Sequence, residues 1–295
     1  MAIVLDQADG NATCRSVSAA DCFRLEHCCL EALRYEILAW PKPGLVSPVD
    51  SGSHRDMHMG TFFASIAALQ GSFAELARAA ASAPSFGVLQ AIGRQAERKM
   101  LYATGGVNTH RGAIFNLGLL AAAAALRSSD RALAALTCGT VVARTWGSEI
   151  LAARPRMPAS HGEHVFRQYA AGGARTEAAA GFPTVYGIGL PTLRRLLQAG
   201  HDREAALIGT LLALMEHLPD TNVLWRGGES GLDLVRSSAA AFNRAGGVDA
   251  AGWQARLQAL HRVFVARNLS PGGSADLVAA TWATHRIETL HAQAG

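Results

Sequence analysis

The sequence predicts an all-α protein, a single compact domain of many helices joined by glycine-rich loops. Hydrophobic residues fill 49% of the 295 positions, whereas aromatic residues fill only 6%. Alanine dominates the apolar share, which favours closely packed helices over sheets. Apolar positions recur at helical spacing, and no segment shows the period of two that is typical of strands.

The first helix is predicted to begin after Ser18, where Ser18 and Asp21 are placed as an N-cap and its box partner. It should end before Pro41, because proline cannot continue a helix. The other predicted helices cover residues 61–82, 85–103, 112–126, 131–153, 164–179, 191–199, 204–218, 253–267 and 274–293.

Start signals support several of these helices. Ser85 and Ser274 are predicted caps, and Pro191 falls in a first helical turn. Polar loops are expected at residues 41–60, 104–111, 172–176, 181–189, 220–231 and 268–273. Because no linker or repeat divides the chain, residues 1–295 are read as one domain, with 1–17 as a flexible N-terminal extension.

Charge and cysteine content exclude several classes of protein. The net charge of +4 is mild and no run of like charges appears, so a nucleic-acid polymer is not expected as a partner. The cysteine count is odd, with no C-x-x-C pair, which argues against a disulfide framework or a zinc site. The uncharged stretch 112–126 is shorter than the roughly 20 residues of a membrane span. With no basic leader at the N-terminus, we expect a cytoplasmic protein.

The loop at residues 41–60 carries reactive side chains. Prolines on both sides of Lys42 hold this cation in place, and His54, Asp56 and His58 bring three ligands or proton carriers together. A solvated loop is the alternative reading.

The loop at 104–112 runs into an apolar helix and is typical of an anion site. Gly105 and Gly106 let the backbone approach a ligand, and Asn108, His110 and Arg111 add donors and charge beside a helix N-terminus. A plain connecting turn capped by Asn108 is the alternative.

Two further loops pair acidic with basic groups. Arg175 and Glu177 offer a phosphate clamp and a carboxylate, or else a surface ion pair. Asp220 and Asn222 are hard oxygen ligands suited to Mg²⁺, and Arg226 could neutralise a phosphate oxygen. An ordinary turn after a helix would also explain Asp220.

The last loop leads into the C-terminal helix. Ser270, Gly272 and Gly273 form a glycine-rich entry, and Asp276 follows in the first turn. A helix dipole alone would account for Asp276.

Together these segments resemble the triphosphoribosyl-dephospho-CoA synthase family over about residues 30 to 285. The matching motifs are Pro-Lys-Pro-Gly-Leu-Val at 41–46, Gly-Ser-His-Arg-Asp-Met at 52–57, Gly-Val-Asn-Thr-His-Arg-Gly-Ala-Ile-Phe at 106–115, Asp-Thr-Asn at 220–222 and Ser-Pro-Gly-Gly-Ser-Ala-Asp-Leu at 270–277. Ser47 and His58 depart from the family pattern, in which both positions often carry Asp, so metal coordination here could differ.

The resemblance implies a pentosyltransferase that uses ATP and 3′-dephospho-CoA. The ribose 2′-hydroxyl of dephospho-CoA attacks C1′ of ATP, and adenine leaves through an oxocarbenium-like transition state. The product is the prosthetic-group precursor of the acyl carrier protein of malonate decarboxylase or citrate lyase. A stand-alone synthase favours malonate decarboxylase, and a downstream holo-acyl-carrier-protein synthase is an expected partner. A homodimer would be common for such an enzyme.

Roles follow from this chemistry as predictions. The catalytic candidates are Asp56, Glu177, Asp220, His54 and His110. The predicted Mg²⁺ ligands are Asp56, Asp220, Asn222 and Glu36. Substrate and phosphate contacts are predicted at Lys42, Gly105, Gly106, Asn108, Arg111, Arg175, Arg226, Ser270, Gly272 and Gly273.

Two other functions fit the same residues. A Mg²⁺-dependent, all-helical hydrolase of nucleotide or ADP-ribosyl glycosides would use water as acceptor. A non-catalytic nucleotide-binding module would hold the ligand without turnover.

Overall fold

The computed structural model describes residues 17–82, 84–153, 165, 168–169 and 171–294. Within these residues the regular structure is entirely helical, and no strand occurs. The all-α prediction is therefore confirmed. The predicted extension 1–17 lies almost wholly outside the described residues, as does the first part of the helix predicted at 164–179.

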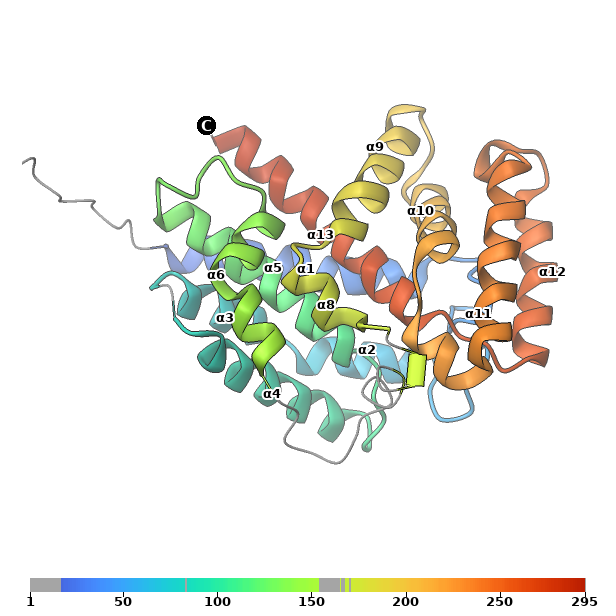
Figure 1. Cartoon of the computed structure of the whole chain (residues 1–295), viewed down its shortest axis with the longest axis horizontal. Coiled ribbons are helices and arrows are strands. Elements are labelled where there is room, and N and C mark those ends of the chain that lie inside the picture. The colour runs from blue at the N-terminus through green and yellow to red at the C-terminus, as the bar shows by residue number, and fades with distance from the viewer. Residues whose placement is uncertain (1–16, 83, 154–164, 166–167, 170, 295) are drawn as a thin grey trace, which may run out of the picture.

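The helices follow one another along the chain, and a long loop at residues 39–58 connects the first two (Figure 1). They are α1 (Ala19–Leu38), α2 (Met59–Ala68), α3 (Ser72–Ala80), α4 (Phe86–Ala103), α5 (Arg111–Ser129), α6 (Cys138–Ala152), α8 (Gly173–Ala179), the π-helix η1 (Val185–Gly189), α9 (Leu190–Gln198), α10 (Arg203–His217), α11 (Thr221–Arg244), the 3-10 turn η2 (Gly247–Asp249), α12 (Trp253–Ala266) and α13 (Gly272–Ala294).

Helix α5 lies at the centre and packs against α1, α3, α6 and α13. Its side chains from Ala113 to Leu126 are buried except for Phe115 and consist mainly of Ala and Leu. Among the described helices, α5 alone is long and apolar enough to match a membrane span. Because most of it is buried, that apolarity builds the core, as predicted for 112–126.

Helix α13 connects the two ends of the molecule. It packs against α1 and α5 on one side and against α9, α10 and α11 on the other, and Figure 1 shows it crossing between the two groups. The glycine-rich loops that precede α5, α11 and α13 meet where these groups face each other.

Several local signals behave as expected. The Ser18 hydroxyl accepts from the backbone N–H of Asp21 and caps α1. Pro191 lies in the first turn of α9. The four described cysteines are buried and unpaired, whereas Cys14 lies outside the described residues.

Two predicted helices have different boundaries. The segment 61–82 contains α2 and α3, because Gly71 adopts a left-handed conformation (φ 81°) that interrupts the helix. The helix predicted from residue 131 begins only at Cys138, where the Thr137 hydroxyl caps the N–H of Thr140.

The prediction of a loop at 220–231 was wrong. This segment forms the first part of α11, which begins after Asp220 and kinks at Gly228 (φ 61°, ψ −160°). The Gly227–Gly228 pair does interrupt the helix, because the backbone of Gly228 is non-helical, but the residues on both sides of it are helical as far as Arg244. Ser274 is likewise not a cap, since α13 already begins at Gly272. The predicted loop 181–189 includes η1.

Candidate active site

A cavity of about 1340 Å³ collects side chains from all the predicted loops. The predicted site residues that line it are Glu36, His54, Asp56, Asn108, His110, Arg111, Arg175, Glu177, Asp220, Asn222, Arg226, Ser270, Gly272 and Gly273. Lys42, Gly105 and Gly106 are not among the lining residues. The fold thus brings segments separated by more than 200 positions in the sequence into one cavity.

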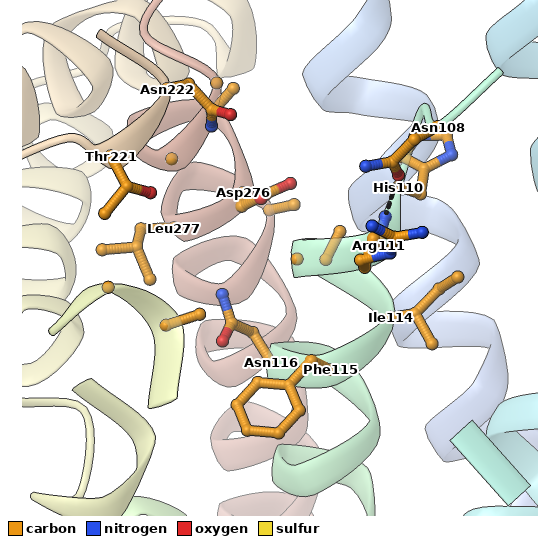
Figure 2. Close-up of a pocket in the computed structure, with 18 of the residues that line it drawn as sticks. Asn108, His110, Arg111, Ile114, Phe115, Asn116, Thr221, Asn222, Asp276 and Leu277 are labelled. Carbon is orange, nitrogen blue, oxygen red and sulfur yellow. Dashed lines mark hydrogen bonds between the residues drawn. The ribbon is translucent and has the colours of Figure 1, made fainter. Parts of the chain in front are cut away.

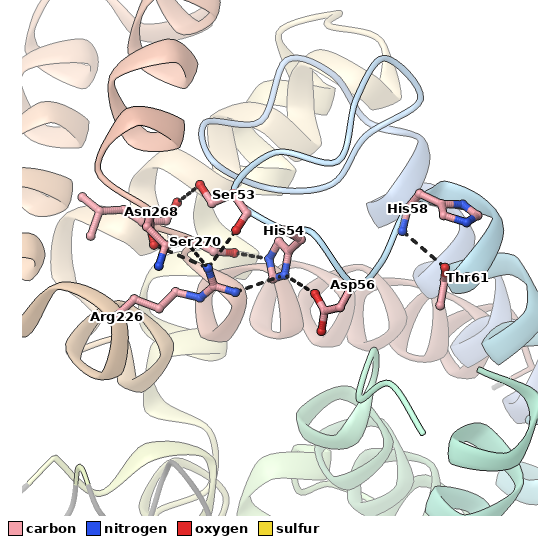
Figure 3. A network of polar contacts seen from close by, with 9 residues as sticks. Ser53, His54, Asp56, His58, Thr61, Arg226, Asn268 and Ser270 are labelled. Carbon is pink, nitrogen blue, oxygen red and sulfur yellow. Dashed lines mark hydrogen bonds and ion pairs between the residues drawn. The ribbon is translucent and has the colours of Figure 1, made fainter. Parts of the chain in front are cut away.

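His54 is held by two neighbours and is neutral (Figure 3). An Nη of Arg226 lies 3.1 Å from His54 Nδ1, and because a guanidinium only donates, Nδ1 must be the acceptor. The proton is then on Nε2, which donates to the Ser270 hydroxyl at 2.8 Å. Burial, and next the Arg226 charge, lower the pKa of His54 to about 4. Both nitrogens are therefore already used within the protein.

Arg226 joins two loops beneath the cavity (Figure 3). It donates to the backbone oxygen of Ser53 at 2.9 Å and to Asn268 Oδ1 at 2.8 Å, in addition to His54. These bonds connect the loop before α2 to the loop before α13. Asp56 lies at the edge of this network with its Oδ1 3.8 Å from His54 Nδ1, and its side chain is 63% exposed.

Asp220 ties the N-termini of α11 and α13 together. Its carboxylate accepts from the N–H of Asn222 at 2.9 Å, of Gly273 at 3.2 Å and of Ser274 at 2.7 Å, and from the Ser274 hydroxyl at 3.0 Å. The side chain is buried, and burial raises the pKa of Asp220 while these hydrogen bonds oppose the rise. Helix N-termini favour such a carboxylate.

Glu177 and Arg175 also form hydrogen bonds within the protein. Glu177 accepts from the N–H of Thr184 at 2.8 Å and from its hydroxyl at 2.9 Å, and burial raises the pKa of this glutamate. Arg175 donates to the carbonyl oxygens of Ile150 and Ala153, at the end of α6. Both side chains fix the walls of the cavity.

Lys42 and Glu36 form a buried pair. Lys42 Nζ lies 2.6 Å from Glu36 Oε1 and 2.5 Å from the Glu36 carbonyl oxygen, and the lysine is only 3% exposed. Burial lowers the pKa of Lys42, and the Glu36 charge opposes that shift. The cation is thus directed at Glu36, which itself lines the cavity.

The loop before α5 presents both satisfied and unsatisfied groups (Figure 2). Asn108 Oδ1 accepts from the N–H of Arg111 at 3.1 Å, as the capping alternative predicted. Arg111 pairs with Glu97. His110 is buried with Nδ1 2.7 Å from the Ser65 hydroxyl, while its Nε2 has no hydrogen-bond partner among the described residues. Burial lowers the pKa of His110 to about 3, so the ring is neutral.

Two cavity residues were not proposed for the site from the sequence. Asp276 lines the cavity and forms no side-chain hydrogen bond or ion pair with another side chain in the described part of the chain. Burial first, then Glu36 and Asp220, raise the pKa of Asp276 well above its usual value. Asn116 is 1% exposed and also lines the cavity. Its signal in the sequence was a single polar residue within an apolar helix.

Comparison with known proteins assigns this site to a family. Residues 22–294 match the family model CitG, described as ATP:dephospho-CoA triphosphoribosyl transferase. The chain belongs to this family. A probable 2-(5''-triphosphoribosyl)-3'-dephosphocoenzyme-A synthase of Pseudomonas fluorescens (strain Pf0-1) is 43% identical, covering 90% of this chain and 92% of the relative.

Other relatives in the family carry the same description. The 2-(5''-triphosphoribosyl)-3'-dephosphocoenzyme-A synthase of Pectobacterium atrosepticum is 41% identical over 88% of this chain and 87% of its own length. A probable synthase of Acinetobacter calcoaceticus is 39% identical over 90% and 91% of the two chains. No solved structure matches the chain. The resemblance found in the motifs is confirmed.

The predicted Mg²⁺ ligands do not form a ready-made cage in this member of the family. Both Asp220 oxygens already accept hydrogen bonds, and Glu36 is paired with Lys42. Within the described residues, no group of three or more His, Cys, Asp or Glu side chains is arranged to hold a metal. Because Mg²⁺ usually keeps waters and substrate phosphates among its ligands and needs only one or two carboxylates, its presence in this site stays a prediction.

Proposed function

We propose that this chain transfers the 5-triphosphoribosyl group of ATP to the 2′-hydroxyl of 3′-dephospho-CoA and releases adenine. The observation that carries the proposal is the single cavity in which every family motif except the start of the Pro-Lys-Pro loop contributes lining residues. In this reaction the C1′–N9 bond of ATP breaks, a bond from C1′ to the 2′-oxygen forms, and the hydroxyl proton is balanced by a proton on adenine.

Asp276 is the best placed acid for the departing adenine. Its carboxyl faces the cavity beside the N-terminus of α5, and an added Cβ on Gly112 would lie 2.1 Å from Asp276 Oδ2. Burial raises the pKa of Asp276 well above its usual value, which is the direction that a general acid requires. Protonating the base removes the negative charge that would otherwise develop on leaving adenine.

Asp56 is the candidate base for the 2′-hydroxyl. Among the predicted carboxylates that line the cavity, Glu36, Glu177 and Asp220 are bonded to protein groups. The side chain of Asp56 is exposed, and its Oδ1 lies 3.8 Å from the unprotonated Nδ1 of His54, which cannot donate to it. It can therefore accept a proton from a substrate hydroxyl without breaking a structural contact.

Arg111 and Asn108 are the proposed contacts for the triphosphate. Both lie where the N-terminus of α5 opens to the cavity, a position that favours anions. Arg175 and Arg226 line the same cavity, but their guanidinium groups mostly bind protein oxygens and hold the loops. Lys42 is proposed to act through Glu36 rather than on a phosphate.

The product would serve as a prosthetic-group precursor. We favour the malonate decarboxylase system over citrate lyase, with a holo-acyl-carrier-protein synthase as the next enzyme. A cytoplasmic location and a homodimer stay predictions.

Mass spectrometry of the purified protein with ATP, Mg²⁺ and dephospho-CoA tests the proposal. The expected result is a CoA-linked triphosphoribosyl product and an equal amount of adenine, formed only when dephospho-CoA is present. Free triphosphoribose with adenine would identify the glycoside hydrolase instead. Binding of both ligands without adenine release would identify the non-catalytic module.

A further inference from the structure

Asn116 carries a buried amide whose oxygen has no hydrogen-bond partner among the described residues. It is the only polar residue of α5 between Ala113 and Leu126, where Ala and Leu otherwise fill the core. Its side chain is 1% exposed, and its Oδ1 accepts no hydrogen bond from any described residue. A buried polar group left unsatisfied costs stability, so an apolar side chain of similar size would serve packing better.

The amide is directed into the cavity rather than into the core. Asn116 is a lining residue, and Figure 2 shows its side chain leaving α5 toward Leu277 on α13. The surrounding cavity wall from α3, the first turn of α4 and α5 is mainly apolar. It includes Leu76, Phe86, Leu89, Phe115 and Leu119. Such a wall suits a flat, largely apolar ring that carries a few polar atoms.

Asn116 and Asp276 both lie along one face of α5. Asn116 follows Gly112 by four residues, so both lie on the same face of α5, about 6 Å apart along the axis. Gly112 is the residue against which the Asp276 carboxyl rests. A purine that meets Asp276 with one edge can therefore reach the Asn116 amide with another.

We propose that Asn116 binds the adenine base of a substrate, with its Oδ1 accepting a hydrogen bond from the exocyclic amine. This assignment rests on the proposed function, because adenine is the base of both ATP and dephospho-CoA. An amide offers an acceptor beside a donor, which matches the amine and the neighbouring ring nitrogen of adenine. Asn116 is then a specificity-determining residue for the base.

The test combines a substitution of Asn116 with a nucleotide that lacks the exocyclic amine. Dissociation constants are measured by calorimetry for ATP and for purine riboside triphosphate, which lacks the amine, with the wild-type protein and with Asn116→Leu. The wild-type protein should bind ATP about tenfold more tightly, as one lost hydrogen bond predicts. In Asn116→Leu this preference should disappear. A second arm repeats the comparison with dephospho-CoA and its amine-free analogue, to show which adenine is bound.

Binding, rather than turnover, keeps the result separate from the proposed reaction. If no CoA-linked product forms, the proposed function fails, while the preference for the amine still tests Asn116. If the wild-type protein shows no preference in either arm, or if Asn116→Leu keeps the preference in full, the assignment is wrong.

Thermal unfolding supplies a second readout. Because the amide is unsatisfied without ligand, Asn116→Leu should unfold at the wild-type temperature or above it. The matched control is Asn243→Leu, since Asn243 donates to Glu216 Oε2 at 2.8 Å outside the cavity. The control should unfold at a lower temperature and keep the preference for the amine. A large loss of stability in Asn116→Leu would show a structural role and overturn the proposal.

Discussion

Side chains in the cavity divide into those that hold the loops and those that face open space. His54, Glu177 and Asp220 use their polar atoms on protein partners. Nε2 of His110 has no hydrogen-bond partner among the described residues, and Asp276 has only the backbone N–H of Ala113. Because a group already bonded to the frame must break contacts to act on a substrate, the second set is better suited to the chemistry.

Replacing Asp276 by Asn should abolish most activity while leaving substrate binding intact. Asn cannot donate a proton to departing adenine, so kcat should fall about 10²- to 10⁴-fold with little change in KM for ATP. Steady-state assays of adenine release measure this effect. Asp233→Asn, at an exposed position of α11, is the control and should behave as wild type. Unchanged kcat in Asp276→Asn would remove the general acid from the proposed mechanism.

The same substitution should change the dependence of stability on pH. The folded-state pKa of Asp276 is raised above its ordinary value of 3.8. The protonated group therefore stabilises the fold fully below that value, and this contribution is lost as pH rises through the folded-state pKa. Asn mimics the protonated form at every pH.

Urea denaturation of both proteins should show this difference. The free energies of unfolding of Asp276→Asn and wild type should agree near pH 4, and the variant should become the more stable as pH rises to about 8. A gap that is constant with pH would mean that Asp276 does not titrate in this range.

At the scale of helices, the site is built where the N-termini of α5, α11 and α13 come together. Asp220 connects the starts of α11 and α13 through one carboxylate. The start of α5 meets Asp276 because Gly112 has no side chain to keep the two apart. Close approach of two helices at a glycine thus places a carboxyl beside an anion-favouring helix end.

Gly112→Ala should separate activity from stability. The new Cβ would overlap Asp276 Oδ2, the end of a flexible side chain, so the carboxyl should move while α5 gains up to about 1 kcal/mol of helix propensity. We expect equal or higher stability and at least a tenfold lower kcat. Thermal unfolding and adenine release measure the two effects.

Gly87 offers a matched control, because it holds the same second position in α4 and is exposed. Its added Cβ would come no closer than 3.6 Å to the Ser85 hydroxyl. Gly87→Ala should keep full activity. Full activity in Gly112→Ala as well would show that the Asp276 carboxyl does not need its present position.

Over the whole molecule, the cavity lies between two groups of helices. Its lining comes from α1 to α6 and α8 on one side and from the starts of α11 and α13 on the other. A ligand that contacts both sides binds the folded state only. Binding should therefore stabilise the fold as a whole.

The expected gain follows from linkage. At a ligand concentration of 100 times Kd, ATP or dephospho-CoA should raise the free energy of unfolding by about 2.7 kcal/mol. Thermal shift measurements over a ligand series would show a midpoint that rises with concentration. Triphosphate alone serves as a control for non-specific anion effects. A midpoint unaffected by either substrate would argue against this cavity as their site.

The sequence predicted the parts of the fold that depend on local rules. Helical periodicity and caps located α1, α4, α5 and α10 within a few residues. Local rules were only partly right at α11, where the Gly-Gly pair does break the helix at Gly228 but the residues on both sides of the break are helical rather than loop. The same rules predicted α2 and α3 as one helix, because the sequence does not show that Gly71 adopts a left-handed conformation.

By itself, the sequence determined the all-α class, the buried central helix and the family, since residue spacing and motifs encode them directly. Most of the site residues that it named line the cavity. Only the tertiary structure decided how far each cavity side chain is engaged: Asp220 and Glu177 accept several hydrogen bonds from the protein, whereas Asp276 accepts only from the backbone of Ala113 and Asn116 Oδ1 from no described residue. The reason is physical, because a side chain's partners come from helices distant in sequence and appear only when those helices pack.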